Sequence, residues 1–134
     1  MAQIIYQVQT KQTVDEAVHA IAETLQRHQF GVLWDLDINQ KLVEKGLDAE
    51  PPYRILEVCS APRAKQVLSR NPQAGNFLPC KIVVYQEAQT RQTIISFANP
   101  VALIGLIDDH RLDALAKEVG ELLKQAVDEA AAFA

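Results

Sequence analysis

Two cysteines are the residues of this sequence whose type and placement most readily allow chemistry. Cys59 ends a strand-like stretch that begins at Tyr53, and Cys80 lies at the start of another such stretch that runs to Glu87. Ser60 follows Cys59 and is a residue type that commonly caps helices, so Cys59 is expected just before a helix N-terminus. The positive end of a helix dipole and nearby cations lower the pKa of a thiol and make it nucleophilic.

Two cations accompany these thiols in the sequence, because Arg63 lies one turn into the expected helix and Lys81 follows Cys80. The thiols meet at one edge of a sheet only if their strands are antiparallel neighbours, whereas a parallel crossover would separate them. Free cysteine is also among the most buried residue types. We therefore favour ordinary core packing for Cys59 and Cys80 over a reactive pair.

A second candidate site consists of acidic residues. Asp35 and Asp37 are two residues apart in a strand-like stretch, which places both carboxylates on one strand face about 7 Å apart. Glu57 would join them if its strand pairs with theirs, and such a group could hold a divalent cation or act as acid and base. The alternative, which is several times more frequent, is the polar side of a sheet whose other face packs under helices.

The alternation along Phe30 to Asn39 decides what surrounds those carboxylates. Trp34 and Leu36 are expected on one face together with Phe30, and Leu33 on the other face together with the two aspartates. A partly apolar open sheet face is what a dimer interface or a ligand cleft requires.

Motifs for metals and cofactors are not found. Zinc requires four ligands at characteristic spacings, and neither cysteine has a second thiol close to it in the sequence. His19, His28 and His110 have no second metal-binding histidine three or four residues away. The sequence also lacks a phosphate-binding glycine-rich loop, an HExxH motif and a nucleophile elbow. We expect no metal site and no cofactor.

Length, composition and charge set broad limits. The chain has 134 residues, 49% of them hydrophobic and 22% charged, which is typical of one soluble globular domain spanning residues 1–134. A net charge of −4 without a basic patch argues against a nucleic-acid partner. The start lacks a secretory signal, and the longest apolar run, VALIGLI, is too short to cross a bilayer. We expect a cytoplasmic protein with free thiols and no membrane partner.

Periodicity and capping signals predict the order of the elements. Thr13 to Glu16 reads as a capping box that starts a long helix, and Asp108 or Asp109 can cap a long closing helix. A short helix is expected after Ser60. The expected strands are Gln3 to Thr10, Phe30 to Asn39, Tyr53 to Cys59, Leu78 to Glu87 and Arg91 to Ala98. This β-α-β-β-β-β-α order, with a short extra helix after the third strand, predicts an α+β fold in which an antiparallel sheet of about five strands has helices on one face.

Several segments resemble the domain of unknown function 302 family over nearly the whole chain and in the family's order. The most specific are FGVLWDLDINQKLVEKG, YRILEVC and LPCKIVVY. The resemblance implies a compact α+β fold with an antiparallel sheet flanked by helices, often as a dimer, and it implies no activity. One departure is that Ser60 and Ala61 follow Cys59 where the family usually has Asn-Pro, so a ligand contact by that asparagine would be missing here.

These observations predict a small cytoplasmic homodimer that binds a small molecule or a protein partner. The expected site is the sheet edge around Cys59, Ser60 and Cys80, with the face of Asp35, Asp37 and Glu57 second. One alternative is a thiol-dependent redox enzyme or sulfur carrier that uses Cys59 as nucleophile and Cys80 as resolving partner. Another is a purely structural interaction module.

Overall fold

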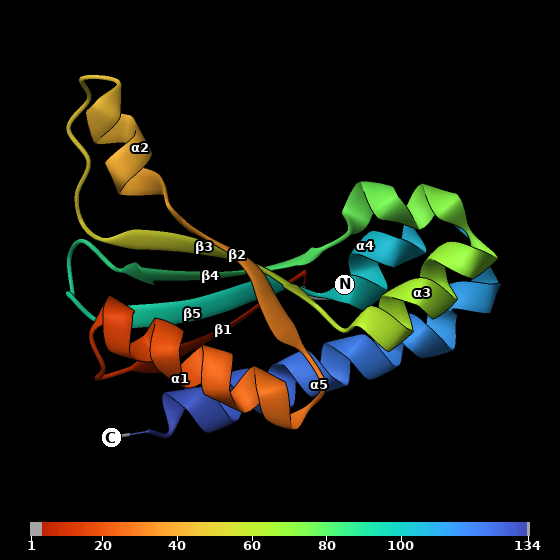
Figure 1. Cartoon of the computed structure of the whole chain (residues 1–134). Coiled ribbons are helices and arrows are strands. Elements are labelled where there is room, and N and C mark those ends of the chain that lie inside the picture. The colour runs from red at the N-terminus through yellow and green to blue at the C-terminus, as the bar shows by residue number, and fades with distance from the viewer. Residues whose placement is uncertain (1–3, 134) are drawn as a thin grey trace.

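A five-stranded antiparallel sheet is the frame of the molecule in the computed structural model, which describes residues 4–133 (Figure 1). The strand order across the sheet is β1-β5-β4-β3-β2, so every neighbouring pair runs antiparallel. The strands are β1 (Ile5–Thr10), β2 (Gly31–Asp37), β3 (Tyr53–Cys59), β4 (Cys80–Gln86) and β5 (Thr93–Ala98). The strand predicted from Gln3 thus begins at Ile5, and Gln3 itself lies outside the described residues.

Two long helices, α1 and α5, cover one face of the sheet (Figure 1). The helices are α1 (Val14–Arg27), α2 (Ile38–Glu44), α3 (Ala61–Arg70), α4 (Pro100–Gly105) and α5 (Asp113–Ala131), with short 3-10 helices η1 (Pro72–Phe77) and η2 (His110–Leu112). The predicted α+β class with an antiparallel sheet is therefore confirmed, and the two long helices lie on one face as expected. Within residues 4–133, no helix is both long and apolar enough to cross a membrane.

The capping box predicted for α1 is present. The Thr13 backbone N–H donates to Glu16 Oε1 at 2.8 Å, and the Glu16 N–H donates to Thr13 Oγ1 at 3.1 Å. Both interactions satisfy amides that the first helical turn leaves without partners. The apolar stripe that follows, which includes Ile21 and Leu25, is buried against the sheet.

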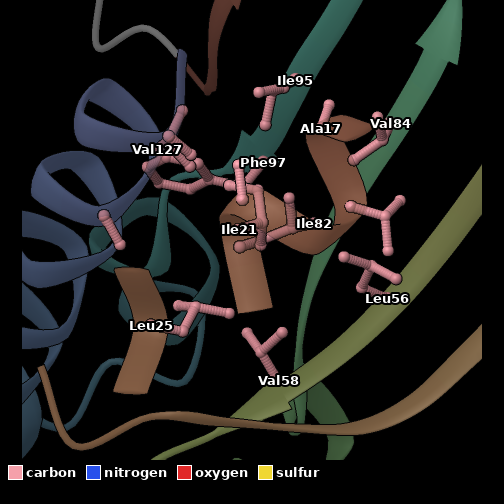
Figure 2. Close-up of a cluster of buried hydrophobic side chains, with 14 of the residues drawn as sticks. Ala17, Ile21, Leu25, Leu56, Val58, Ile82, Val84, Ile95, Phe97 and Val127 are labelled. Atoms are coloured by element: carbon pink, nitrogen blue, oxygen red, sulfur yellow. The ribbon is translucent and has the colours of Figure 1, made fainter. Parts of the chain in front are cut away.

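The main core lies between α1, α5 and the covered face of the sheet (Figure 2). Alternate residues of the two neighbouring strands β3 and β4 point into it, because successive side chains of a strand lie on opposite faces. Leu56 and Val58 on β3 and Ile82 and Val84 on β4 are fully buried there. Ile21 and Leu25 of α1, Val127 of α5, and Ile95 and Phe97 of β5 complete the cluster that the figure labels.

The predicted faces of the β2 side chains are wrong from the middle of the strand onwards. Val32 pairs with Val58, but the next paired residue is Trp34, opposite Glu57, which leaves Leu33 as an extra residue in a β-bulge. A bulge shifts the alternation by one residue. Trp34 and Leu36 therefore lie on the face away from the core, and Asp35 and Asp37 lie on the same face as Val32.

β2 also ends two residues before the expected boundary at Asn39. Asp37 caps α2 there, since its Oδ1 accepts a hydrogen bond from the Gln40 backbone N–H at 3.1 Å. Helix α2 then extends away from the sheet on the side opposite α1 and α5 (Figure 1). None of its residues is buried.

The other face of the sheet has no helix lying across it in the described part of the chain (Figure 1). We call its residues on the three strands β2, β3 and β4 the open face. Their positions follow from the strand registers. The open face consists of Gly31, Trp34, Leu36, Tyr53, Ile55, Glu57, Cys59, Lys81, Val83 and Tyr85.

Candidate functional site

The two cysteines lie at the same end of the sheet. Because β3 and β4 are antiparallel neighbours, the last residue of β3, Cys59, lies near the first residue of β4, Cys80. Cys80 is directly opposite Val58 in the register. Both are free thiols. The sheet-edge location expected for Cys59 and Cys80 is therefore the one found.

Their chemical environment is the reverse of the one expected for a nucleophile. Burial raises the pKa of Cys80 to about 11, with a smaller contribution from the nearby Cys59 thiol. Burial also raises the pKa of Cys59. The lowered pKa values that a reactive pair would require are not found, and both groups are protonated near neutral pH.

The guanidinium of Arg63 is bound by other side chains. Arg63 Nε donates to Glu118 Oε1 at 2.8 Å, and Nη1 donates to Ser60 Oγ at 3.1 Å. Ser60 precedes α3 as expected, but its side chain makes no capping hydrogen bond. The buried Ser60 hydroxyl therefore holds Arg63 in place rather than capping the helix.

A cavity of about 270 Å³ opens beside Cys80. Its inner wall is apolar and comes from α3, α4, α5 and the segment that joins η1 to β4. The apolar lining includes Val67, Phe77, Leu78, Leu103, Ile104, Leu115, Ala116 and Val119. The charged and amide-bearing residues of the lining are Glu57, Lys81 and Asn76, of which Lys81 and Asn76 are exposed, so they mark the mouth.

A second apolar cluster, separate from the main core, builds this cavity. It joins Val67 of α3, Ile104 of α4, and Leu115 and Ala116 of α5. Asn99 starts α4 by accepting the Val101 N–H at 3.0 Å, and Pro100 occupies the first turn. The short helix α4 packs mainly on α5. The VALIGLI run therefore contributes one wall of the cavity.

Cys80 separates this cavity from a smaller one of about 30 Å³. Cys59, Ser60 and Arg63 line the smaller space together with Cys80. Its volume is about the share of liquid volume that a single water occupies. The larger cavity is thus the part of this sheet end that has room for a ligand.

The acidic candidate residues do not form one patch. Asp35 lies on the covered face and accepts a hydrogen bond from Arg54 Nε at 2.8 Å, with a second contact from Arg54 Nη2 to its other oxygen. Arg54 Nη1 also donates to Asp15 Oδ1 at 2.6 Å. Asp37 is a helix cap, and Glu57 lies on the open face.

Asp35, Asp37 and Glu57 therefore do not form the cation or acid–base group that was considered as the less frequent possibility, because the bulge and the strand register separate Glu57 from the aspartates. Among residues 4–133, no group of three or more His, Cys, Asp or Glu side chains is arranged to hold a metal ion.

Cys80 and Glu57 are lining residues that were candidates from the sequence, whereas the apolar lining residues were not identified. Phe77 ends η1 and Leu78 follows it, and Ile104 and Leu115 belong to separate elements. The sequence feature that could have indicated the cavity is the apolar run around Ile104, because Ile104 belongs to the second cluster and not to the main core.

Comparison with known proteins gives a family and a fold. The family model described as "Domain of unknown function DUF302" matches residues 6–130. A solved structure described as an uncharacterized conserved protein DUF302 from Bacillus stearothermophilus is 38% identical in sequence and has a TM-score of 0.91. That alignment covers 96% of this chain and 99% of the other. No curated protein matches the sequence.

Proposed function

The chain belongs to the DUF302 family, whose description assigns no activity, and we propose from the geometry of the site that the protein binds a small, uncharged, largely apolar molecule. The observation that carries this proposal is the apolar cavity beside Cys80. Ligand sites are typically concave, mostly apolar and equipped with a few polar groups that orient the ligand. This cavity is near the lower end of their usual size range, so the ligand is small.

The charges at the mouth favour an uncharged ligand. Glu57 and Lys81 face each other in the register of β3 and β4 and carry opposite charges, so the pair adds no net charge to the mouth. The inner wall offers a charged group no ionic partner, and desolvating an unpaired charge is costly. A hydroxyl or amide at the end of the ligand could instead bond Asn76, Glu57 or Lys81 at the mouth.

A matched series of compounds tests this proposal. We expect 4-phenylbutan-1-ol to bind, and the anionic 4-phenylbutanoate and cationic 4-phenylbutylamine to bind at least tenfold more weakly, in calorimetric titrations at neutral pH. The substitution Ala116→Leu fills the cavity and should abolish binding. Ala114→Leu adds the same atoms at an exposed position of α5 and should not change it. Failure of all three compounds to bind, or equal binding to both variants, would contradict the proposal.

We further propose that the protein is a cytoplasmic homodimer. Free thiols suit a reducing compartment, and the half-buried apolar side chains of the open face suit an interface. Sedimentation equilibrium at micromolar concentration tests the dimer. A dimer that binds none of the compounds would favour the alternative of a purely structural interaction module. The thiol-enzyme alternative gains no support from thiols with raised pKa values.

A further inference from the structure

We propose that a second copy of this chain covers the open face and thereby closes the mouth of the cavity, so that dimerisation and ligand binding strengthen each other. This inference rests on the proposed function and adds that the second copy of the chain completes the binding site. Its starting point is that Glu57 and Lys81 belong both to the open face and to the lining of the cavity. A molecule that covers the open face at that end must also cover the mouth.

The open face and its surroundings expose more apolar surface than isolated side chains would. Trp34 is 52% exposed and Leu33, at the bulge, is 64% exposed. Val43 on α2 and Leu47 just beyond it are also exposed, and α2 extends on the same side of the sheet as the open face (Figure 1). A contiguous apolar patch rimmed by polar residues usually marks an interaction site.

The pattern of paired residues on β3 and β4 favours a second copy as the occupant. The pairs on the open face are Tyr53 with Tyr85, Ile55 with Val83, and Glu57 with Lys81. The two tyrosine rings stack with their centroids 5.0 Å apart. Along both strands the open face thus presents an aromatic, then an aliphatic and then a charged residue, and each residue lies opposite one of the same kind on the neighbouring strand.

A two-fold axis that runs along the strands between β3 and β4 exchanges the members of these pairs. Each tyrosine then lies over a tyrosine of the other copy, and Glu57 of each copy lies over Lys81 of the other. Among the described residues, neither Glu57 nor Lys81 forms an ion pair within its own chain, so both charges are available. Isologous two-fold interfaces require this kind of self-complementarity.

The same axis leaves room for α2. Helix α2 follows the edge strand β2, so it lies to one side of the axis, and the α2 of the second copy lies to the other side. The two helices therefore flank the interface without meeting. Val43 and Leu47 would then contact the edges of the other copy.

Charge reversal tests the face and its pairing. Lys81→Glu and Glu57→Lys each place like charges opposite one another across the axis, and we expect each to weaken the dimer at least tenfold in sedimentation equilibrium. The double variant Glu57→Lys, Lys81→Glu restores opposite charges and should recover dimerisation. Trp34, the single tryptophan of the sequence, should show red-shifted emission whenever the dimer dissociates. Full dimerisation of both single variants would overturn the proposal.

A variant outside the cavity tests the coupling. Ile55 lies on the open face and does not line the cavity. We expect Ile55→Glu to dissociate the dimer and to weaken binding of 4-phenylbutan-1-ol at least tenfold. Leu106→Glu places the same charge at an exposed apolar residue elsewhere and should change neither. Urea unfolding verifies that both variants are folded.

The outcomes separate this inference from the proposed function. Unchanged affinity in a monomeric Ile55→Glu variant would overturn the coupling while leaving the cavity as the binding site. A wild-type dimer that binds no compound would overturn the proposed function and the coupling together. In that case the charge-swap rescue and the Trp34 emission would still decide whether the open face is the interface.

Discussion

The substitution Ala116→Leu, which adds side-chain atoms to the cavity next to Cys80, should stabilise the protein, although enlarging a buried alanine usually destabilises a protein. Ala116 is 5% exposed and lines the cavity, whereas Ala126, on the same helix, is 0% exposed and packs in the main core. Leucine has nearly the helix propensity of alanine, so changes of propensity do not obscure the comparison. The two alanines therefore form a matched pair of sites for the same substitution.

The two sites should respond with opposite signs. Ala116→Leu buries three more carbons in existing space, which gains about 0.8 kcal/mol each and about 2.4 kcal/mol in total. Ordering the longer side chain costs about 0.5–1 kcal/mol. We expect a net increase of about 1.5 kcal/mol in the free energy of unfolding. Ala126→Leu should instead lower that free energy by about 1–3 kcal/mol, because a close-packed core has no space for the added atoms.

Urea unfolding followed by circular dichroism measures both effects. With an m-value of about 1.5 kcal/mol/M, Ala116→Leu should raise the midpoint by about 1 M without changing m. A destabilisation of Ala116→Leu as large as that of Ala126→Leu would refute the reasoning, because it would show that the space beside Cys80 is already filled in solution.

Four further predictions follow from individual contacts. The Tyr6 hydroxyl donates to Asp128 Oδ1 at 2.5 Å, which together with burial raises the pKa of Tyr6 from 10.0 to about 12. The stability that this interaction contributes is therefore complete below pH 10 and is lost as the pH rises towards 12, so the difference in unfolding free energy between wild type and Tyr6→Phe should shrink over that interval. Because their pKa values are raised, Cys59 should react with an aromatic disulfide reagent more slowly than free cysteine, and Cys80 more slowly still; rapid reaction of either in the folded protein would contradict this. A double-mutant cycle of Arg54→Met and Asp35→Asn should give a coupling energy of about 1 kcal/mol, since the pair is bidentate but partly exposed, and a value near zero would contradict the contact. Hydrogen bonds from Arg111 and Asn71 lower the pKa of Asp109, so Asn71→Ala should raise the pKa of Asp109 in an NMR titration, and an unchanged value would contradict the contact.

The sequence predicted an element well where the signal for that element depends only on residues close together in the chain. The signals for the Thr13–Glu16 capping box and for the short helix after Ser60 depend on residues a few positions apart. Helix periodicity and capping act over one or two turns, so they can be read without knowledge of the fold. The proximity of Cys59 and Cys80 could be predicted only on the condition that β3 and β4 are antiparallel neighbours.

The face assignments on β2 failed because alternation assumes an uninterrupted strand. The single extra residue at Leu33 moves Trp34 and Leu36 to the open face and turns Asp35 towards Arg54. Whether a strand bulges depends on the partner strand that it must match, which lies many residues away. The acidic group considered from the sequence, Asp35 and Asp37 with Glu57, therefore does not form, because the bulge depends on tertiary structure.

What the sequence determined by itself was the class of the fold, the approximate order of its elements and the free state of the two thiols. The tertiary structure alone decided the chemistry of the sheet edge at which these thiols lie. Burial raised the pKa values of both thiols, Glu118 and Ser60 occupied Arg63, and four separate segments enclosed an apolar cavity beside Cys80. The physical reason is that burial, ion pairing and empty volume are properties of surfaces brought together from distant parts of the chain.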